Sequence, residues 1–245
     1  MEIRKFKKVG RNKYKVIFDN EELTLYEDII LKYDLLIKKE ISIDDLDSII
    51  EENNDYEAYN LALNYIEVKM RNRKELYTYL NNKGFDKQLI NKTISKIEKL
   101  GLLDKNAYIK AYINDKVNLT LDGPYKIRKS LLDLDFNEKD IDSYLSTFDN
   151  NIWKEKLEKL VNKKKSIMKN KSYYMFVQKM KNDLYNMGYE SEMIDNCLEN
   201  IKYESDALKH DYEKAKKKYS DNTKLINYLL RKGYSYEEIK TLTKE

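Results

Sequence analysis

A corner that ends one helix and starts another recurs four times along this chain. The copies read LYTYLNNKGFDKQLINKTI, IRKSLLDLDFNEKDIDSYL, MKNDLYNMGYESEMIDNCL and LINYLLRKGYSYEEIKTLT, beginning at Leu76, Ile127, Met180 and Leu225. Regular spacing of this length is typical of tandem modules, so the repeat predicts an array of similar units. The corner residues, which are 51, 53 and 45 positions apart, are Gly84, Asp135, Gly188 and Gly233.

Each copy has the residues that such a corner requires. The glycine can adopt the left-handed conformation that ends a helix, whereas Asp135 predicts strain or a different turn in the second copy. An aromatic residue follows every corner, and Asp86, Asn137 and Ser235 are placed to cap the next helix, Ser235 with capping-box spacing to Glu238. One helix face before the corner carries an apolar pair. These pairs are Leu76 and Leu80, Ile127 and Leu131, Met180 and Leu184, and Leu225 and Leu229.

A further helical stretch precedes every corner, so each module is predicted to contain three helices. Six glycines and the single proline, Pro124, are too few turn residues for a β-rich chain. The predicted fold is mainly α, an elongated and curved array of tandem three-helix modules after a small N-terminal α+β element. The expected domains are the N-terminal element at 1–53 and modules at 54–104, 105–148, 149–203 and 204–245.

The first 53 residues have a different pattern from the rest of the chain. Tyr14, Val16 and Phe18 stand at alternate positions, and the sequence DNEE separates them from Leu23 and Leu25, which predicts a β-hairpin. Short separate helices are expected in YEDIILKYDLL and SIDDLDSIIEEN. This part has 10 basic and 13 acidic residues, a net charge of −3, so the positive charge of the chain lies elsewhere.

The strongest basic region runs from Asn151 to Lys181, where ten lysines face two glutamates. A second lysine run, KAKKKY, lies near residue 216. Such regions are candidates for contact with a polyanion, although a solvated helix face in a lysine-rich chain has the same composition. Tyrosine rings can stack on unpaired bases, and the pair within KNKSYYMF is the one to test. Tyr59, Tyr108, Tyr112 and Tyr189 are better explained by packing.

No signature of a catalytic centre is present in the sequence. Cys197 is the only cysteine and fits a small core residue, and His210 is the only histidine, which argues against most zinc sites and Ser-His or Cys-His nucleophiles. Gly-rich phosphate loops and the G-x-S-x-G and H-E-x-x-H motifs are missing. We therefore expect a protein without enzymatic activity, metal or cofactor. Since it has no signal-peptide pattern and no apolar run of about 18 residues, we expect a cytoplasmic monomer without membrane contact.

Several ordered motifs resemble the RecX family of regulatory proteins, in the form found in low-GC Gram-positive bacteria. They are AYNLALNYIEVKMRNRKELYTYLNNKGF in the first module, LGLLDKNAYIKAYINDKV leading into the second, and DGPYKI at its middle helix. The N-terminal hairpin and YEDIILKYDL are also similar to that family. Arg71, Arg73 and Glu75 match the family pattern R-S-x-x-E-L, with Asn72 in the serine position. An asparagine can cap the following helix as serine does.

The resemblance implies tandem three-helix modules and binding to the RecA filament on single-stranded DNA, in or along its groove. It also implies inhibition of the recombinase, ATPase and coprotease activities of RecA, and hence a role in DNA repair, homologous recombination and the SOS response. The candidates for contact with the partner or DNA are Arg71, Arg73, Lys126, Arg128, Lys163, Lys164, Lys165, Lys169, Lys171, Tyr173, Tyr174, Lys214, Lys216, Lys217 and Lys218.

Two other functions fit the same residues. Paired short helices around a tight corner also resemble helix-turn-helix units, so the chain could bind DNA directly through its basic third module. A helical scaffold for an unrelated protein is the third reading. The dependence of binding on salt separates direct phosphate contact from protein contact.

Overall fold

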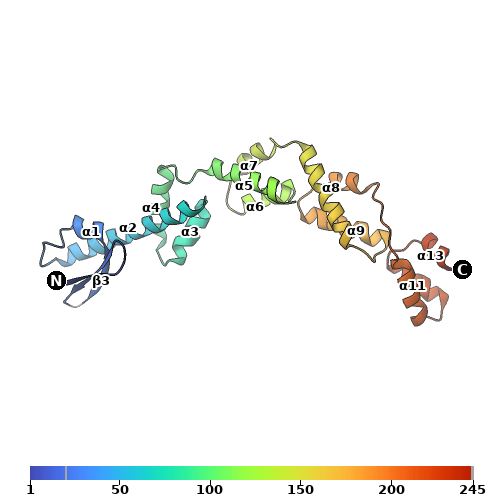
Figure 1. Ribbon diagram of the computed structural model, residues 1–245, viewed down its shortest axis with the longest axis horizontal. Coiled ribbons are helices and arrows are strands. Elements are labelled where there is room, and N and C mark those ends of the chain that lie inside the picture. Colours follow the sequence, from blue (N-terminus) through green and yellow to red (C-terminus); the bar gives the residue numbers. More distant parts are fainter. Residues whose placement is uncertain (20, 244–245) are drawn as a thin grey trace. The chain divides into compact units, whose positions relative to one another are not determined.

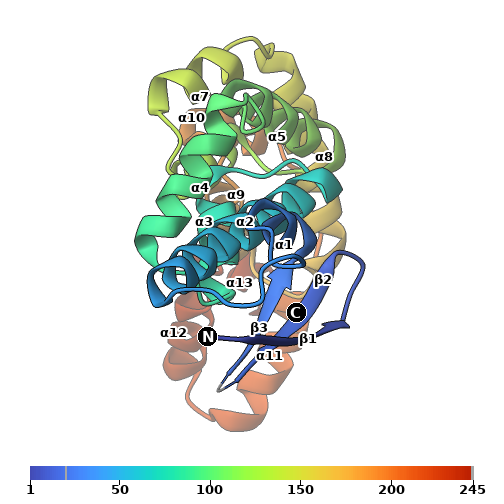
Figure 2. The ribbon, with the colours of Figure 1, turned by 90° about the vertical axis from the view of Figure 1, so that its left-hand side faces the viewer.

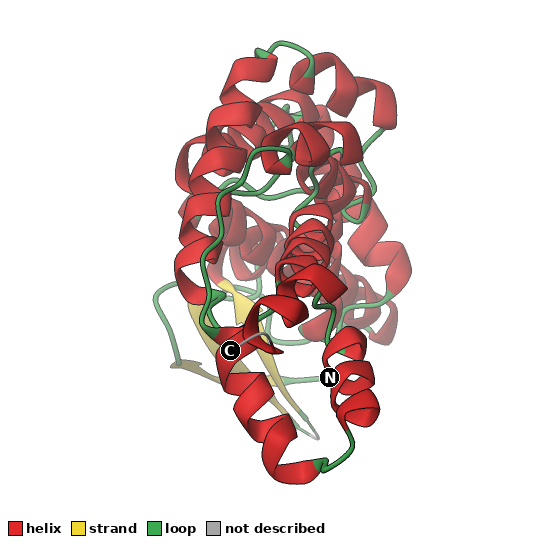
Figure 3. Cartoon of the chain, turned by 90° about the vertical axis from the view of Figure 1, so that its right-hand side faces the viewer, coloured by secondary structure: helices red, strands yellow, loops and turns green. Residues whose placement is uncertain are grey.

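The computed structural model describes residues 1–19 and 21–243, and within this part the chain is mainly helical (Figure 3). It divides into two compact units, Met1–Tyr108 and Ile109–Glu245. Figure 1 shows the order of the elements along the chain. The mainly α class predicted from the sequence is confirmed.

The first unit begins with an antiparallel sheet of order β1-β2-β3, formed by Ile3–Lys8, Lys13–Phe18 and Glu22–Tyr26 (Figure 2). The β2–β3 pairing confirms the predicted hairpin, with Val16 opposite Leu23, while residue 20 of its turn lies outside the described residues. Strand β1 was not predicted, because IRKFKK has only two apolar residues and reads as a charged segment.

The helix α2 runs without a break from Ile43 to Val68, after the short helix α1 at Glu27–Lys32. The prediction of a separate short helix that ends near residue 53 is therefore wrong. Asn53, at the expected end of that helix, is buried; it accepts a hydrogen bond from the Tyr26 backbone N–H and donates one to the Thr24 carbonyl oxygen. This helix joins two cores, because Ile49 packs beneath the sheet and Ala62 packs in the first module.

Four groups of three consecutive helices follow the sheet and α1, beginning with α2. The expected border at 53–54 falls inside α2, and the other expected borders fall at the start of α5 or between helices. The division into five domains stays a prediction. The remaining helices are α3 (Arg73–Asn82), α4 (Lys87–Lys99), α5 (Lys105–Leu119), α6 (Pro124–Leu132), α7 (Glu138–Leu145), α8 (Asn150–Ile167), α9 (Tyr173–Asn186), α10 (Ser191–Leu198), α11 (Ala207–Lys218), α12 (Asn222–Arg231) and α13 (Tyr236–Thr243).

All four corners have the predicted left-handed residue, with φ of 91°, 66°, 87° and 82° in chain order. Asp135 supplies the value of 66°, which confirms the expected strain at the second corner. After each corner the aromatic residue donates its backbone N–H to the carbonyl five positions earlier, as Phe85 does to Leu80 and Tyr189 to Leu184. This bond, from the second residue past the helix end, defines the Schellman motif.

The residues predicted to pack and to cap do so. The apolar pairs before the four corners are all at most 5% exposed. Asn72 forms a complete capping box with Glu75, and Ser235 and Glu238 exchange the same two kinds of hydrogen bond. The substitution of asparagine for serine at position 72 therefore keeps the cap.

Within the second unit, the third and the fourth corner each pack on the middle helix of the preceding module. The N–H groups of Gly123 and Tyr125 at the start of α6 donate to Met187 O (2.7 Å) and Gly188 O (3.1 Å). The N–H groups at the start of a helix have no partner within that helix. The two corner carbonyls therefore supply the acceptors that these N–H groups would otherwise lack. Similarly, the Ser172 hydroxyl at the start of α9 donates to Lys232 O at 2.7 Å. We call these contacts the second–third joint and the third–fourth joint.

Candidate functional site

The basic region predicted from the sequence forms α8, the following loop and part of α9, and one of its lysines faces inward. Lys156 is 7% exposed, and its ammonium group donates to backbone oxygens of Lys116, Val117 and Thr120 at the C-terminal end of α5. Burial lowers the pKa of Lys156. Cationic groups stabilise a helix C-terminus, so Lys156 fastens the third module to the second. Trp153, Leu157 and Leu160 are buried at helical spacing around it, a pattern from which this inward position could have been inferred but was not.

Two further lysines of the region form ion pairs. Lys164 lies 2.9 Å from Asp183, and Lys181 lies 2.6 Å from Asp195. With Lys156 these account for three of the ten lysines in 151–181, and the other seven form no ion pair with any residue that the structure describes. Those seven are Lys154, Lys159, Lys163, Lys165, Lys169, Lys171 and Lys179.

Two tyrosines start α9 beside these lysines. Tyr173 is 45% exposed and Tyr174 is 58% exposed, while the Ser172 hydroxyl before them accepts the N–H of Met175 as a helix cap. Lys169 and Lys171 lie in the loop that leads to this helix. The structure thus places exposed rings near lysines that have no ion-pair partner among the described residues, an arrangement that can bind both the bases and the phosphates of a single strand.

The second lysine run ends α11. Lys214, Lys216, Lys217 and Lys218 are exposed, and the last three lie in the final turn, where positive charge also stabilises the helix dipole. Lys218 lies over the Tyr219 ring, 5.3 Å from its centroid. These lysines are accessible to a partner, although the helix end gives a structural reason for them too.

The predicted arginines are all engaged within their own modules. The Arg71 guanidinium lies over the Tyr65 ring, 4.0 Å from its centroid, and 3.6 Å from Glu75. Arg73 pairs with Glu98 at 2.6 Å, and Arg128 pairs with Asp142 at 2.7 Å and with Glu138. The structure therefore gives these residues an internal role. Their contact with a partner stays a prediction.

Lys126 belongs to the second–third joint. Its ammonium group lies 2.7 Å from Asp122, which also accepts from Lys116 at 3.4 Å. Burial raises the pKa of the Asp122 carboxyl, but the hydrogen bonds and charges of the two lysines outweigh it, so the pKa lies below its ordinary value. The joint is closed by the Tyr189 hydroxyl, whose pKa burial raises and which donates to Leu121 O at 3.1 Å.

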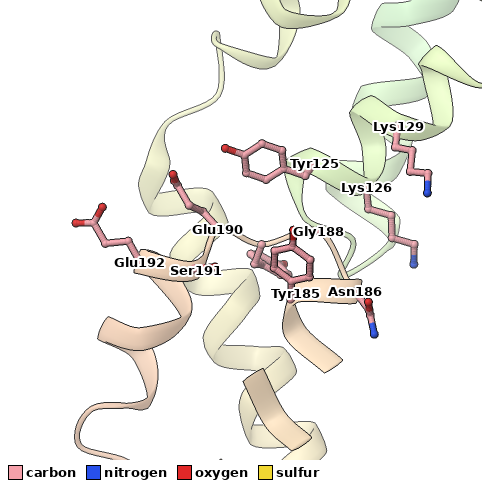
Figure 4. Close-up of a pocket in the computed structure, with 10 residues that line it drawn as sticks. Tyr125, Lys126, Lys129, Tyr185, Asn186, Gly188, Glu190, Ser191 and Glu192 are labelled. Carbon is pink, nitrogen blue, oxygen red and sulfur yellow. The ribbon is translucent and has the colours of Figure 1, made fainter. Parts of the chain in front are cut away.

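A cleft of about 680 Å³ opens beside this joint. Figure 4 shows that Tyr125 comes from α6 and that Tyr185 comes from the end of α9. Lys126 and Lys129 point to one side of the cleft, and Glu190 and Glu192 lie on the other side. We call this space the joint cleft. Of its residues, the sequence predicted only Lys126 for partner contact, and Gly188 and Tyr189 for the corner and its packing. The two exposed tyrosines were missed because they are 60 positions apart and the joint alone brings them together.

Two features of other protein classes are missing from the described part of the chain. Among residues 1–19 and 21–243, no helix has both the length and the apolar character needed to cross a membrane. The same residues contain no group of three His, Cys, Asp or Glu side chains that could hold a metal ion.

Comparison with known proteins gives a consistent result. Residues 58–96 match the family model described as RecX, first three-helix domain. A protein of Halalkalibacterium halodurans named Regulatory protein RecX is 29% identical over 87% of this chain and 85% of its own length. A protein of the same name from Streptococcus agalactiae is 28% identical over 100% of this chain and 99% of its own length.

Solved structures have the same fold. A crystal structure of a regulatory protein RecX aligns with a TM-score of 0.62 and 22% identity, over 82% of this chain and all of that one. A crystal structure of RecX from Lactobacillus salivarius aligns with a TM-score of 0.53 and 24% identity, over 60% of this chain and 96% of that one. With its repeated corners, its three-helix groups and these relatives over nearly its whole length, the chain is similar in sequence and in fold to the regulatory proteins named RecX.

Proposed function

We propose that this chain binds the RecA filament on single-stranded DNA and inhibits the recombinase, ATPase and coprotease activities of RecA in the cytoplasm, without catalysis of its own. The names of its relatives support a regulatory role. The observation that carries the proposal is made in the third module, where seven lysines that form no ion pair with any described residue lie in the same region as the exposed Tyr173 and Tyr174. This surface suits a partner that combines protein with exposed nucleic acid.

The mechanism requires unequal binding to different states of the filament. A ligand shifts an equilibrium only by the difference between its affinities for the two states. A chain of several modules that contacts neighbouring RecA subunits would favour the filament state that hydrolyses ATP slowly, or would hinder the addition of subunits. Inhibition therefore predicts that the chain binds the ATP-bound filament and RecA without DNA with different affinities.

Co-sedimentation tests the partner first. The chain is centrifuged with RecA assembled on single-stranded DNA with ATP, and in parallel with the DNA alone. Pelleting with the filament and not with the bare DNA is the expected result. The rate of DNA-dependent ATP hydrolysis is then measured at saturating chain, and an unchanged rate with filament binding demonstrated would disprove inhibition.

Charge reversal tests the role of the basic surface. The K163E/K165E/K169E variant should bind the filament less tightly with unchanged helicity, because each of these lysines lacks an ion-pair partner among the described residues. Lys164 is left in place, since a glutamate there would face Asp183. The matched control is K5E/K7E/K8E, which reverses three exposed lysines of β1 with the same change in net charge. Equal loss in both variants would mean that net charge alone is responsible.

Direct DNA binding is the second candidate function, and the exposure of Tyr173 and Tyr174 favours it. Phosphate contacts release counterions, so the logarithm of the binding constant falls steeply and linearly with the logarithm of salt concentration. Equal pelleting with bare DNA and filament, with that salt dependence, would replace the RecA proposal by this one. The double variant Y173A/Y174A should then weaken binding to single-stranded DNA more than to duplex DNA, because only unpaired bases stack on these rings.

A further inference from the structure

We propose that the joint cleft docks a segment of a protein partner that presents an arginine next to an acidic residue. The inference extends the proposed function, since the RecA protein of the filament is the expected source of the segment. The cleft lies between α6 and the α9–α10 corner, within the second unit, and two modules build it together.

The walls of the cleft are exposed aromatic rings. Tyr125 is 53% exposed and Tyr185 is 65% exposed, although both belong to well-formed helices. Tyrosine supplies a large and stiff contact area with a polar end, and it is enriched among the residues that dominate binding energy at protein interfaces. Tyr189, which also lines the cleft, is buried and holds the two modules together through its hydrogen bond to Leu121 O. The joint therefore fixes the positions of the two helices that carry these rings.

The charges of the cleft are separated. Glu190 and Glu192 are exposed on one side, and neither forms an ion pair with a residue that the structure describes (Figure 4). Lys129 on the other side also has no ion-pair partner within the described part of the chain, whereas Lys126 is held by Asp122. The cleft thus offers two carboxylates to a cation and one ammonium group to an anion.

The chain itself shows which ligand completes such a set. In the first module, the Arg71 guanidinium lies 4.0 Å from the centroid of the Tyr65 ring and pairs with Glu75. Near the sheet, the Lys13 ammonium lies 4.5 Å from the centroid of the Tyr26 ring and pairs with Glu57 at 2.6 Å. Ring, cation and carboxylate occur together in both places. In the joint cleft, the carboxylates of Glu190 and Glu192 form no ion pair with any residue that the structure describes, because Lys126 and Lys129 lie on the other side.

Arginine fits this set better than a nucleotide does. A guanidinium can stack on a tyrosine ring and form a planar pair of hydrogen bonds with a carboxylate at the same time. Phosphate groups would be repelled by Glu190 and Glu192, which lie on the same cleft as the rings. An acidic residue beside the arginine would reach Lys129 on the opposite side.

A peptide titration tests the cleft without reference to RecA. The probe is the peptide Gly-Arg-Asp-Gly, acetylated and amidated at its ends, and its control has citrulline in place of arginine. The full chain is followed by NMR through the backbone amide signals of Ser191 and Glu192. We expect these signals to shift with the arginine peptide, with about tenfold weaker binding of the citrulline peptide and of the E190Q/E192Q variant. Equal binding of both peptides would overturn the proposal, as would shifts caused instead by a single-stranded oligonucleotide.

Filament binding tests the identity of the partner. E190Q/E192Q should bind RecA filaments about three- to tenfold less tightly than the unaltered chain, whereas the control E155Q/E199Q, two exposed glutamates elsewhere in the third module, should not differ. If the unaltered chain does not bind filaments, the proposed function is wrong. The peptide titration is then the only test of whether the cleft binds an arginine segment. If filaments bind the variant and the unaltered chain equally, RecA is not the source of the segment and this extension is wrong.

Discussion

Replacement of Gly188 by alanine should weaken the second–third joint, and Gly84 provides a matched control. Both glycines lie at the same position of their corners, with φ of 87° and 91°. A Cβ at Gly84 would meet no atom of the other described residues within 4 Å, whereas a Cβ at Gly188 would lie 2.3 Å from Lys126 N and 2.9 Å from Lys126 Cα. The two variants therefore share the backbone strain and differ in the clash.

The size of each effect follows from these contacts. The left-handed conformation costs a residue with a Cβ about 1–2 kcal/mol, so G84A should lower the free energy of unfolding by that amount. In G188A, Lys126 belongs to the first turn of α6 and must move by roughly 1 Å to reach an ordinary carbon contact. Such overpacking adds about 1–3 kcal/mol. We expect G188A to be about 1–3 kcal/mol less stable than G84A.

Urea unfolding gives the stabilities, and amide hydrogen exchange shows where the structure opens. The N–H groups of Gly123 and Tyr125 donate across the joint, so their protection should fall in G188A and stay unchanged in G84A. Equal stability of the two variants, with both amides protected as in the unaltered chain, would show that the corner does not pack on α6 as described.

Three further changes test other parts of the structure. K156M should lower the free energy of unfolding by about 1–3 kcal/mol, because it removes the ammonium group that donates to the Val117 and Thr120 carbonyl oxygens at the end of α5, and an undiminished urea midpoint would disprove that role. D135G should raise the free energy of unfolding by about 0.5–1 kcal/mol through relief of the positive φ, and a lower melting temperature would contradict this. The Asp122 carboxyl has a lowered pKa in the folded chain, so its contribution to stability is present above the ordinary pKa of aspartate, about 3.9, and is lost as pH falls through the folded value. D122N should therefore reduce the loss of stability with acidification, measured as urea midpoints across that range.

The candidate site could be predicted only in part. The lysine-rich composition of 151–181 indicated a basic surface, and the exposure of Lys163, Lys169, Tyr173 and Tyr174 agrees with contact to a partner. Composition does not show which of these lysines already form ion pairs within the chain. Lys164 on α8 pairs with Asp183 on α9. These residues are 19 positions apart, and no local sequence pattern predicts the contact.

The sequence by itself determined the local structure, because corners, caps and buried faces depend on residues a few positions apart. Glycine at a left-handed position, an apolar pair one turn apart and a capping side chain each act within a single helix end. Tertiary structure decided which groups remain available for binding. Gly123 meets Gly188, Lys156 reaches the end of α5, and Tyr125 comes to share a cleft with Tyr185, all through contacts between modules. Such contacts depend on distances in space that no spacing along the chain encodes.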